Sequence, residues 1–176
     1  MALSSNVALI PSLLDHDALL LPLDQVVTRL GVRIPSEYLR LIAPENRAVM
    51  FDKSTEIRPL IPNPLTSKTG FQSVLTLFGL SDGDHGILKN FERLNGRIES
   101  NYVPIGEDGL GNLYMLDSKT KQIVFWHHEC PDGENSPTAF TLVSDDVVGF
   151  ISGLQPASVE RDVNLSAGVK RVQFDF

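Results

Sequence analysis

The sequence has few of the features that disulfide-bonded, membrane-spanning or secreted proteins require. Its single cysteine, Cys130, excludes a disulfide within the chain and a metal cluster built of thiolates. No apolar run approaches the ~20 residues that a helix needs to cross a bilayer. Residues 1–23 lack the basic start and the unbroken apolar stretch of a secretory signal, because Pro11 and Pro22 interrupt them. We therefore expect a cytoplasmic protein without a membrane anchor.

Positive charge is scarce as well: 15 Lys and Arg residues stand against 22 Asp and Glu residues, which gives a formal charge of −7. Residues 82–146 hold twelve of these acids and five bases, so the acidic excess is confined to this segment. Because an acidic domain repels phosphate backbones, direct nucleic-acid binding is not expected. A basic protein partner would be attracted instead, although the same charge would also serve solubility alone.

The remaining composition is that of one globular domain. Hydrophobic residues make up 42% of the chain and charged residues 21%, and 176 residues are enough to bury a core. The pattern divides the chain into an N-terminal arm (residues 1–21), a domain (residues 22–155) and a C-terminal extension (residues 156–176). We expect a loosely attached arm and an extension that ends in an amphipathic edge strand. Apolar side chains of the arm could dock on the domain or on a second copy, and the arm and the extension together could pair two copies into a homodimer. These side chains are Val7, Leu9, Ile10, Leu13 and Leu14.

Residues 102–129 specify their structure most strongly, and they predict a strand, a tight turn and a hairpin. Residues 111–116 and 122–128 are rich in aromatic, β-branched and long apolar side chains, with polar residues between them. Alternation places apolar side chains on both faces of each strand, so we expect a central hairpin covered on both sides. Trp126 is predicted to lie in the core beside Tyr114, and the alternative is an exposed anchor for a partner.

Helical periodicity marks four further segments, which are residues 23–30, 35–42, 87–94 and 147–154. Gly31 is expected to end the first helix and Ser144 to cap the last. Strands are expected at residues 49–52, 56–61 and 138–143, whereas the apolar segment 71–80 fits a strand or a helix equally. This order of elements predicts an α+β fold, with a mainly antiparallel central sheet and helices packed against it.

Two motifs in this pattern are similar to those of a known family. The first is Ile34-Pro35-Ser36-Glu37-Tyr38, and the second is VPIGEDGLGNLYMLD followed by IVFWHHE, within residues 102–129. In these motifs, and in the order of its elements from residue 23 to residue 154, the chain resembles the SUKH superfamily, the SMI/KNR-like domain of fungal cell-wall regulators and of many bacterial proteins. It departs from the family at Ala43-Pro44-Glu45-Asn46, where members often carry Asn-Gly-Gly.

The resemblance implies a non-enzymatic domain that binds another protein and needs no cofactor. Many bacterial members resemble immunity proteins, which bind and block a cognate toxin, often a nuclease. The alternative is a regulatory or scaffolding module. Because the family's binding surfaces vary, the resemblance supplies no binding residues. We take the candidates from the charge pattern instead, as acids on predicted turns that could hold a basic toxin: Asp82, Asp84, Glu107, Asp108, Asp132 and Glu134.

One motif indicates an enzyme instead. The run Gly79-Leu80-Ser81-Asp82-Gly83 fits the G-x-S-x-G turn of serine hydrolases, and Asp117 and His127 follow in the order that those enzymes use. That motif requires a strand, a strained turn and a helix in a parallel sheet, and this chain lacks the alternating strand and helix units of such a sheet. We therefore expect no catalytic residue and keep a serine hydrolase as a remote alternative.

No metal or phosphate site is expected either. The run His127-His128-Glu129-Cys130 offers ligands, but neighbours on a strand face opposite sides, so the two imidazoles cannot share one ion. Residues 107–111 combine two acids and two glycines with no lysine, which fits a tight turn better than a phosphate cradle. Residues 82–84 lack the alternating ligands of a calcium loop.

Overall fold

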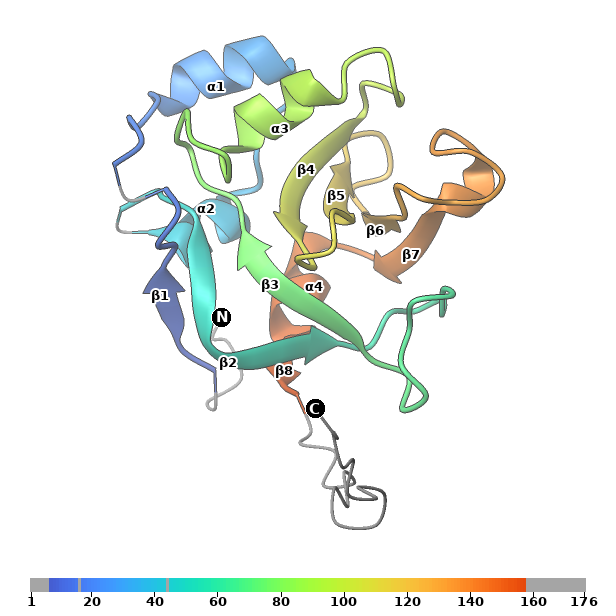
Figure 1. Ribbon diagram of the computed structural model, residues 1–176. Helices are drawn as coiled ribbons and strands as arrows, with labels where there is room; N and C mark the ends of the chain where they lie inside the picture. Colours follow the sequence, from blue (N-terminus) through green and yellow to red (C-terminus); the bar gives the residue numbers. More distant parts are fainter. Residues whose placement is uncertain (1–6, 16, 44, 158–176) are drawn as a thin grey trace, which may run out of the picture.

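The chain folds into an antiparallel sheet with helices packed against it, which confirms the predicted α+β class (Figure 1). The structure is a computed structural model that describes residues 7–15, 17–43 and 45–157, so the edge strand expected at residues 169–176 lies outside the described residues. Seven strands lie side by side in chain order, and β8 pairs with β2. The strands are β1 Leu9–Pro11, β2 Val49–Ile57, β3 Gln72–Leu77, β4 Tyr102–Glu107, β5 Leu113–Asp117, β6 Ile123–Trp126, β7 Phe140–Ser144 and β8 Gln155–Pro156.

The hairpin predicted from residues 102–129 is formed by β5 and β6, which lie between β4 and β7. Its register pairs Leu113 with Trp126 and Tyr114 with Phe125, so Trp126 and Tyr114 face opposite sides of the sheet. All five residues of β5 are buried, which confirms the expected burial on both faces. Trp126 belongs to the core as predicted, although not beside Tyr114.

β2 is one continuous strand, where the sequence predicted two shorter ones. Its register shifts between Met50 and Thr55, and this irregularity bends the strand. On the edge away from β3, its first half pairs with β1 and its second half with β8. The chain then turns toward the other end of the sheet, where the N–H groups of Leu60 and Ile61 donate to β7 carbonyls at 3.1 and 3.0 Å. The sheet therefore curls until its two ends meet at one corner.

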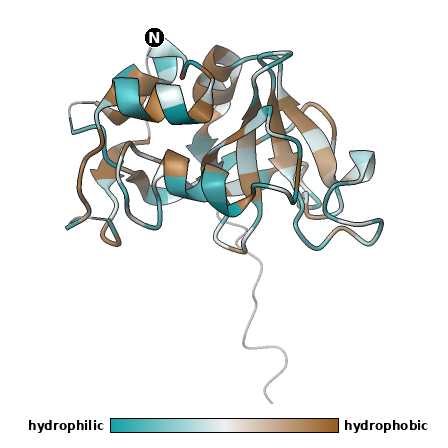
Figure 2. Cartoon of the chain, turned by 90° about the horizontal axis from the view of Figure 1, so that it is seen from above, coloured by the Kyte–Doolittle hydropathy of each residue, from teal (hydrophilic) through white to brown (hydrophobic). Residues whose placement is uncertain are grey.

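The α-helices of the described residues follow the predicted periodicity, and they are α1 Leu23–Leu30, α2 Ser36–Ile42, α3 Ile87–Arg93 and α4 Val147–Gly153. α1 and α3 lie side by side at one end of the sheet, and α2 and α4 pack together behind it (Figure 1). Seen from above, the strands are largely hydrophobic, whereas the helices at the periphery carry hydrophilic residues outward (Figure 2).

The helix ends agree with the sequence at α1 and differ at α4. Gly31 ends α1 in the left-handed conformation that glycine adopts readily, with φ of 66°. The N-cap of α4 is Asp146 rather than Ser144, because the Asp146 carboxylate accepts a hydrogen bond from the Gly149 N–H at 2.7 Å. Ser144 is instead the last residue of β7, and its hydroxyl donates to the Asp146 carbonyl.

A buried tyrosine joins α2 to the sheet. Tyr38 is fully buried, and its hydroxyl lies 2.7 Å from the Phe78 carbonyl oxygen and 2.5 Å from that of Ile105. The hydroxyl has one proton, and the Ile105 carbonyl also accepts from the Phe78 N–H, so the Phe78 carbonyl relies on Tyr38. Burial raises the pKa of Tyr38 well above its usual value, so the hydroxyl remains a donor.

Replacing Tyr38 with Phe should lower the free energy of unfolding by about 1–3 kcal/mol, the typical cost of leaving a buried polar group without its hydrogen bond. Tyr102→Phe is the matched control, because Tyr102 is partly exposed and its stacking on Phe140 does not need the hydroxyl. Urea denaturation followed by circular dichroism measures both. An unchanged free energy of unfolding for Tyr38→Phe would contradict the assigned role.

Candidate protein-binding face

The N-terminal arm is attached to the domain more firmly than the sequence predicted. Residues 12–15 and 17–21, which we call the strap, lie against the loop between β3 and α3. The Leu21 N–H donates to the Leu80 carbonyl at 2.7 Å, and the Asp82 N–H donates to the Leu19 carbonyl at 3.0 Å. The Asp82 carboxylate also accepts from the Leu19 N–H at 2.8 Å. The expectation of a loose arm is therefore wrong for these residues.

The carboxylate of Asp15 is the centre of the contacts that hold the strap. Asp15 is 2% exposed, and its carboxylate accepts hydrogen bonds from the Ser81 hydroxyl at 2.8 Å and from the His85 backbone N–H at 3.1 Å. Its backbone carbonyl accepts from the Arg47 guanidinium at 3.1 Å, and the same guanidinium reaches the Ala18 carbonyl at 2.7 Å. Because a buried carboxylate needs such donors, these contacts fix the position of the strap.

The imidazole of His85 extends this network to the end of β4. Its Nδ1 lies 3.0 Å from Ser12 Oγ and its Nε2 lies 3.3 Å from Glu107 Oε1, while the ring stacks on Phe78. The hydrogen bond with Glu107 raises the pKa of His85 above its ordinary value, against the opposing effect of burial. The Ser12 hydroxyl can accept from a protonated Nδ1 or donate to a neutral one, so the network keeps its bonds in both states.

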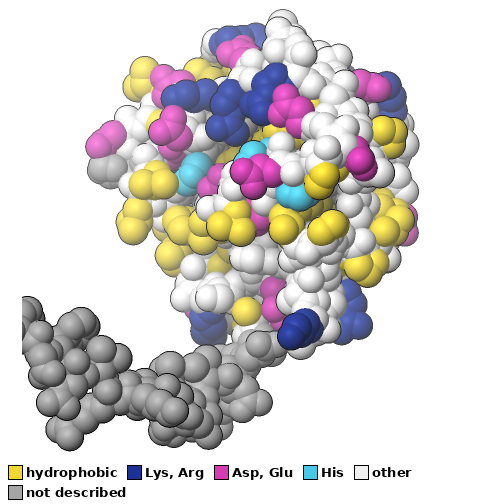
Figure 3. Space-filling view, turned by 45° about the vertical axis from the view of Figure 1, so that its right-hand side comes forward, with side chains coloured by type: hydrophobic (Ala, Val, Ile, Leu, Met, Phe, Trp, Pro, Cys, Tyr) yellow, Lys and Arg dark blue, Asp and Glu magenta, His cyan; other side chains and the backbone are white. Residues whose placement is uncertain are grey.

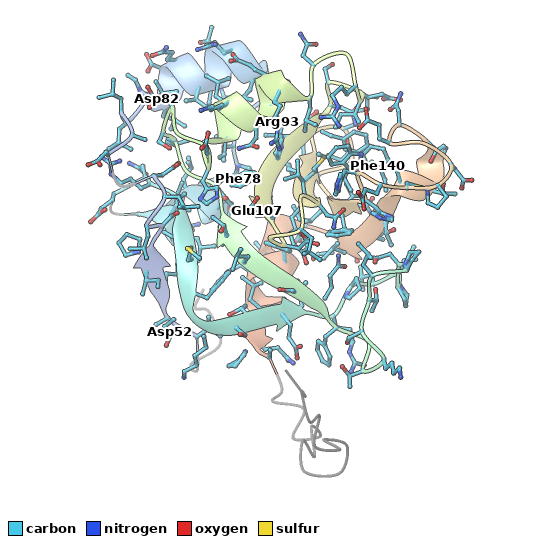
Figure 4. All side chains as sticks on the ribbon, in the orientation of Figure 1. Asp52, Phe78, Asp82, Arg93, Glu107 and Phe140 are labelled. Atoms are coloured by element: carbon cyan, nitrogen blue, oxygen red, sulfur yellow. The ribbon has the colours of Figure 1, made fainter. Side chains whose placement is uncertain are left out.

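The structure places the six predicted contact residues in two groups. Asp82, Asp84, Glu107 and Asp108 lie on the β3–α3 loop and at the β4–β5 turn, which are joined through the His85 imidazole. Figure 4 shows Asp82 on the loop near α1 and Glu107 where β4 ends. The second group, Asp132 and Glu134, lies on the loop between β6 and β7.

In the first group, each carboxylate already has a partner within the chain. Asp82 accepts from the strap, Glu107 pairs with His85, and Asp108 accepts from the Leu110 N–H at 2.8 Å. Asp84 pairs with Lys89 at 2.8 Å, but 84% of its side chain remains exposed. An ionised carboxylate offers about four acceptor positions, so Asp84 can still bind a cation from outside.

The second group is held in place by Trp126. The indole N–H donates to the Glu134 carbonyl at 2.7 Å, and the Arg97 guanidinium lies 5.6 Å from the ring centroid while it pairs with the Glu134 carboxylate. The Asp132 carboxylate accepts from the Thr138 hydroxyl at 2.7 Å. Because Trp126 is 2% exposed, it positions this loop rather than serving as an exposed anchor.

Four leucines of the strap are exposed, two of which were not singled out from the sequence. Leu13, Leu14 and Leu19 are 81%, 74% and 71% exposed, and Leu20 is 45% exposed. The sequence places Leu13 and Leu14 in an apolar arm but does not reveal that its backbone is pinned. The consecutive leucines at residues 13–14 and 19–21, which fit neither helical nor strand periodicity, are the signal that could have found them. On the face shown in Figure 3, hydrophobic side chains group next to Asp, Glu and His side chains, and Lys and Arg side chains gather beyond these.

The hydrolase motif does not assemble a catalytic site. Ser81 is fully buried, its hydroxyl donates to the strap carboxylate, and the strands around it are antiparallel. Asp117 holds the turn between β5 and β6. A different row of groups, Ser12, His85 and Glu107, has the residue types of a triad. Ser12 is 2% exposed, however, so its hydroxyl is closed to substrates.

Metal binding finds no support in the arrangement of side chains. Across residues 7–15, 17–43 and 45–157, no group of three or more His, Cys, Asp or Glu side chains could hold an ion. The His128 imidazole is instead hydrogen-bonded to Asn112 at 2.9 Å. The β4–β5 turn has positive φ at Gly109 and Gly111, as its glycines suggested.

None of the described helices combines the length and apolarity that crossing a membrane requires.

A model of a known protein family matches most of the chain. Residues 22–153 match the SMI1 / KNR4 family (SUKH-1). The match includes the β3–α3 loop, the β4–β5 turn and the loop that carries Asp132 and Glu134, whereas β1 and the strap precede it. No curated protein and no solved structure matches the chain.

The contact between His85 and Glu107 predicts a pH-dependent stability. Because the folded-state pKa of His85 is raised, protonated His85 stabilises the fold, fully below about pH 6, and this contribution is lost as the pH rises through the folded-state pKa. Glu107→Gln should therefore destabilise the protein more in mildly acidic than in mildly alkaline solution. Urea titrations at both pH values measure this. Glu45→Gln, at an exposed acid, should show no such difference, and an equal loss for Glu107→Gln at both pH values would contradict the assignment.

Gly83 lies too close to the strap for a larger residue. A Cβ atom there would lie 2.4 Å from Asp15 Oδ1 and 2.8 Å from Ala18 Cβ. Gly83→Ala should therefore lower the free energy of unfolding by about 1–3 kcal/mol, the usual cost of overpacking. In the control Gly153→Ala, the new Cβ would contact Ile57 at an ordinary 3.4 Å. Hydrogen exchange at the Leu21 amide should accelerate in Gly83→Ala alone, and unchanged exchange there would refute the close packing.

Proposed function

The chain belongs to the SMI1/KNR4 family (SUKH-1), and from this premise we propose that it is a non-enzymatic, protein-binding domain that acts as an immunity protein. It would bind to a basic surface of the toxin, such as the active site of a nuclease, and block that site. The acids of the β3–α3 loop and the β4–β5 turn would make the contact. Binding would require no chemistry from this chain, only charge and shape that complement the toxin.

The observation that carries this proposal is that non-covalent contacts hold two acidic segments together. Asp82, Asp84, Glu107 and Asp108 are presented by two segments that His85 and the buried Asp15 hold together. Fixed loops lose little conformational entropy on binding, so more of the interaction energy appears as affinity. Negative charge on this face also accelerates encounter with a cationic partner.

The exposed pair of Asp84 and Lys89 is the contact that a partner can replace most easily. The Asp84 side chain is 84% exposed and that of Lys89 is 54% exposed, and such surface pairs contribute about 0–1 kcal/mol. A partner's Arg or Lys could therefore take the place of Lys89 at little cost. Glu134 is less available, because its side chain is 32% exposed and pairs with Arg97.

A regulatory or scaffolding module is the second candidate, because the resemblance to the SMI/KNR-like domain of fungal cell-wall regulators implies it as well. The same acidic face would then hold a signalling protein rather than a toxin. A toxin gene adjacent to the gene for this chain would favour the immunity function over this alternative.

The chain should recover a basic protein from its native cell, and Asp84→Lys should weaken that complex about tenfold by slowing association, as reversal of a peripheral charge does. Asp145→Lys changes the net charge equally at an exposed acid between β7 and α4, and it should leave the affinity unchanged. Affinity purification with mass spectrometry identifies the partner, and surface plasmon resonance gives the rates. Recovery of no basic protein partner by the wild-type chain would sink the proposal.

A further inference from the structure

We propose that the leucines of the strap form the apolar centre of the binding face, and that they receive a cationic, amphipathic segment of a partner protein. This inference rests on the proposed function, which it deepens by naming the chemistry of the partner's surface. It adds to the acidic contacts a hydrophobic one, contributed by residues 13–20, which precede the family match.

The backbone of the strap is held at several points. The Ser12 N–H donates to the Ala48 carbonyl at 2.9 Å, and its hydroxyl contacts His85. Further along, the Asp15 carboxylate is buried in the network, and the Leu19 and Leu21 N–H groups donate to Asp82 and Leu80. The strap therefore has a fixed course and does not have to be ordered by a partner.

The leucine side chains between these fixed points gain nothing from the fold. Leu13, Leu14 and Leu19 each leave more than two thirds of their surface exposed to water. Polar residues would suit such exposed positions equally well, so the core does not explain the leucines. Four of the twelve large hydrophobic side chains that are exposed in the described residues come from this short strap. A cluster of this kind is typical of an interaction site rather than of scattered surface residues.

The step between the two groups of leucines is held at both of its ends. The Ala18 N–H donates to the Asp15 carbonyl at 3.2 Å, and the Arg47 guanidinium binds both the Asp15 and the Ala18 carbonyls. One guanidinium therefore holds the backbone on both sides of the step between the two groups of leucines. Exposed apolar side chains on a backbone held in this way suit the centre of an interface.

The charge around the leucines selects the occupant. Asp82 and Asp84 lie on the loop that contacts the strap, and the strap itself contains Asp17. Among the nearby cations, Arg47 binds backbone carbonyls and Lys89 pairs with Asp84. The Lys89 hydrogen bond lowers the pKa of Asp84, and Arg93 adds a smaller effect in the same direction. A second copy of the chain would bring the same acids against them, and an anionic membrane would be repelled. A segment with apolar side chains flanked by Lys or Arg satisfies both features.

A synthetic amphipathic helix of Leu and Lys, about 18 residues or five turns long, is the probe. Fluorescence anisotropy compares its binding to the wild type, to the triple variant Leu13→Gln, Leu14→Gln, Leu19→Gln, and to the control Leu60→Gln, Ile61→Gln, Leu65→Gln. The control residues are exposed leucine and isoleucine side chains in the loop after β2. A counterpart peptide with Glu in place of Lys tests the charge requirement. Thermal unfolding confirms that each variant is folded. If the triple variant does not fold, the single variant Leu13→Gln takes its place.

The Lys peptide should bind the wild type and the control with equal affinity. Its affinity for the strap variant should be lower by about tenfold or more. The Glu peptide should bind none of them. Equal binding of the Lys peptide to all three proteins would overturn the inference. So would a wild-type dimer, seen by sedimentation, that the strap variant converts to monomer, or strap-dependent binding to anionic vesicles.

The same variants separate this inference from the function on which it rests. If the strap variant binds the recovered basic partner as tightly as the wild type does, while Asp84→Lys does not, the acidic face stands and the leucine site is wrong. If no basic partner exists but the peptide result holds, the immunity function is wrong and the leucine site stands.

Discussion

A carboxylate that leaves water must find hydrogen-bond donors inside the protein, and at Asp15 this requirement organises the whole binding face. Its donors are the Ser81 hydroxyl and the His85 N–H, both on the loop between β3 and α3. One buried side chain thus fastens a segment that precedes the family match to a loop that lies within it. The exposed leucines and the acids of the loop acquire a common, fixed geometry from this single attachment.

Much of the fold could be predicted because the informative patterns are local. The alternation in β5 and β6, the helical face of α1 and the glycine that ends it are properties of short segments, and the structure agrees with them. Errors occur where a distant contact decides. β2 is continuous while β1 and β8 share its edge. Asp146 caps α4 because pairing with Ile123 of β6 extends β7 through Ser144. Neither neighbour can be identified from the sequence of the segment itself.

The negative charge of the proposed binding face could be predicted from the sequence, but the side-chain contacts within it could not. Turn chemistry located Asp82, Asp84 and Asp108 correctly between elements, whereas Glu107 is the last residue of β4 and only partly exposed. It could not show that Glu107 contacts His85 or that Asp15 is buried, since the partners lie 22 and 70 residues away along the chain. The G-x-S-x-G match was misleading for the same reason: Ser81 serves the strap, which a local motif does not include.

The edge of β2 shows a further benefit of the segments that flank the family domain. β2 has nine residues, and an open strand of that length, with Val49, Met50 and Phe51 at its start, would be a template for pairing with other chains. β1 occupies its first half and β8 its second, and each is itself three residues or fewer. The sheet therefore ends on this side in short strands, which are poor templates for edge-to-edge pairing with other chains.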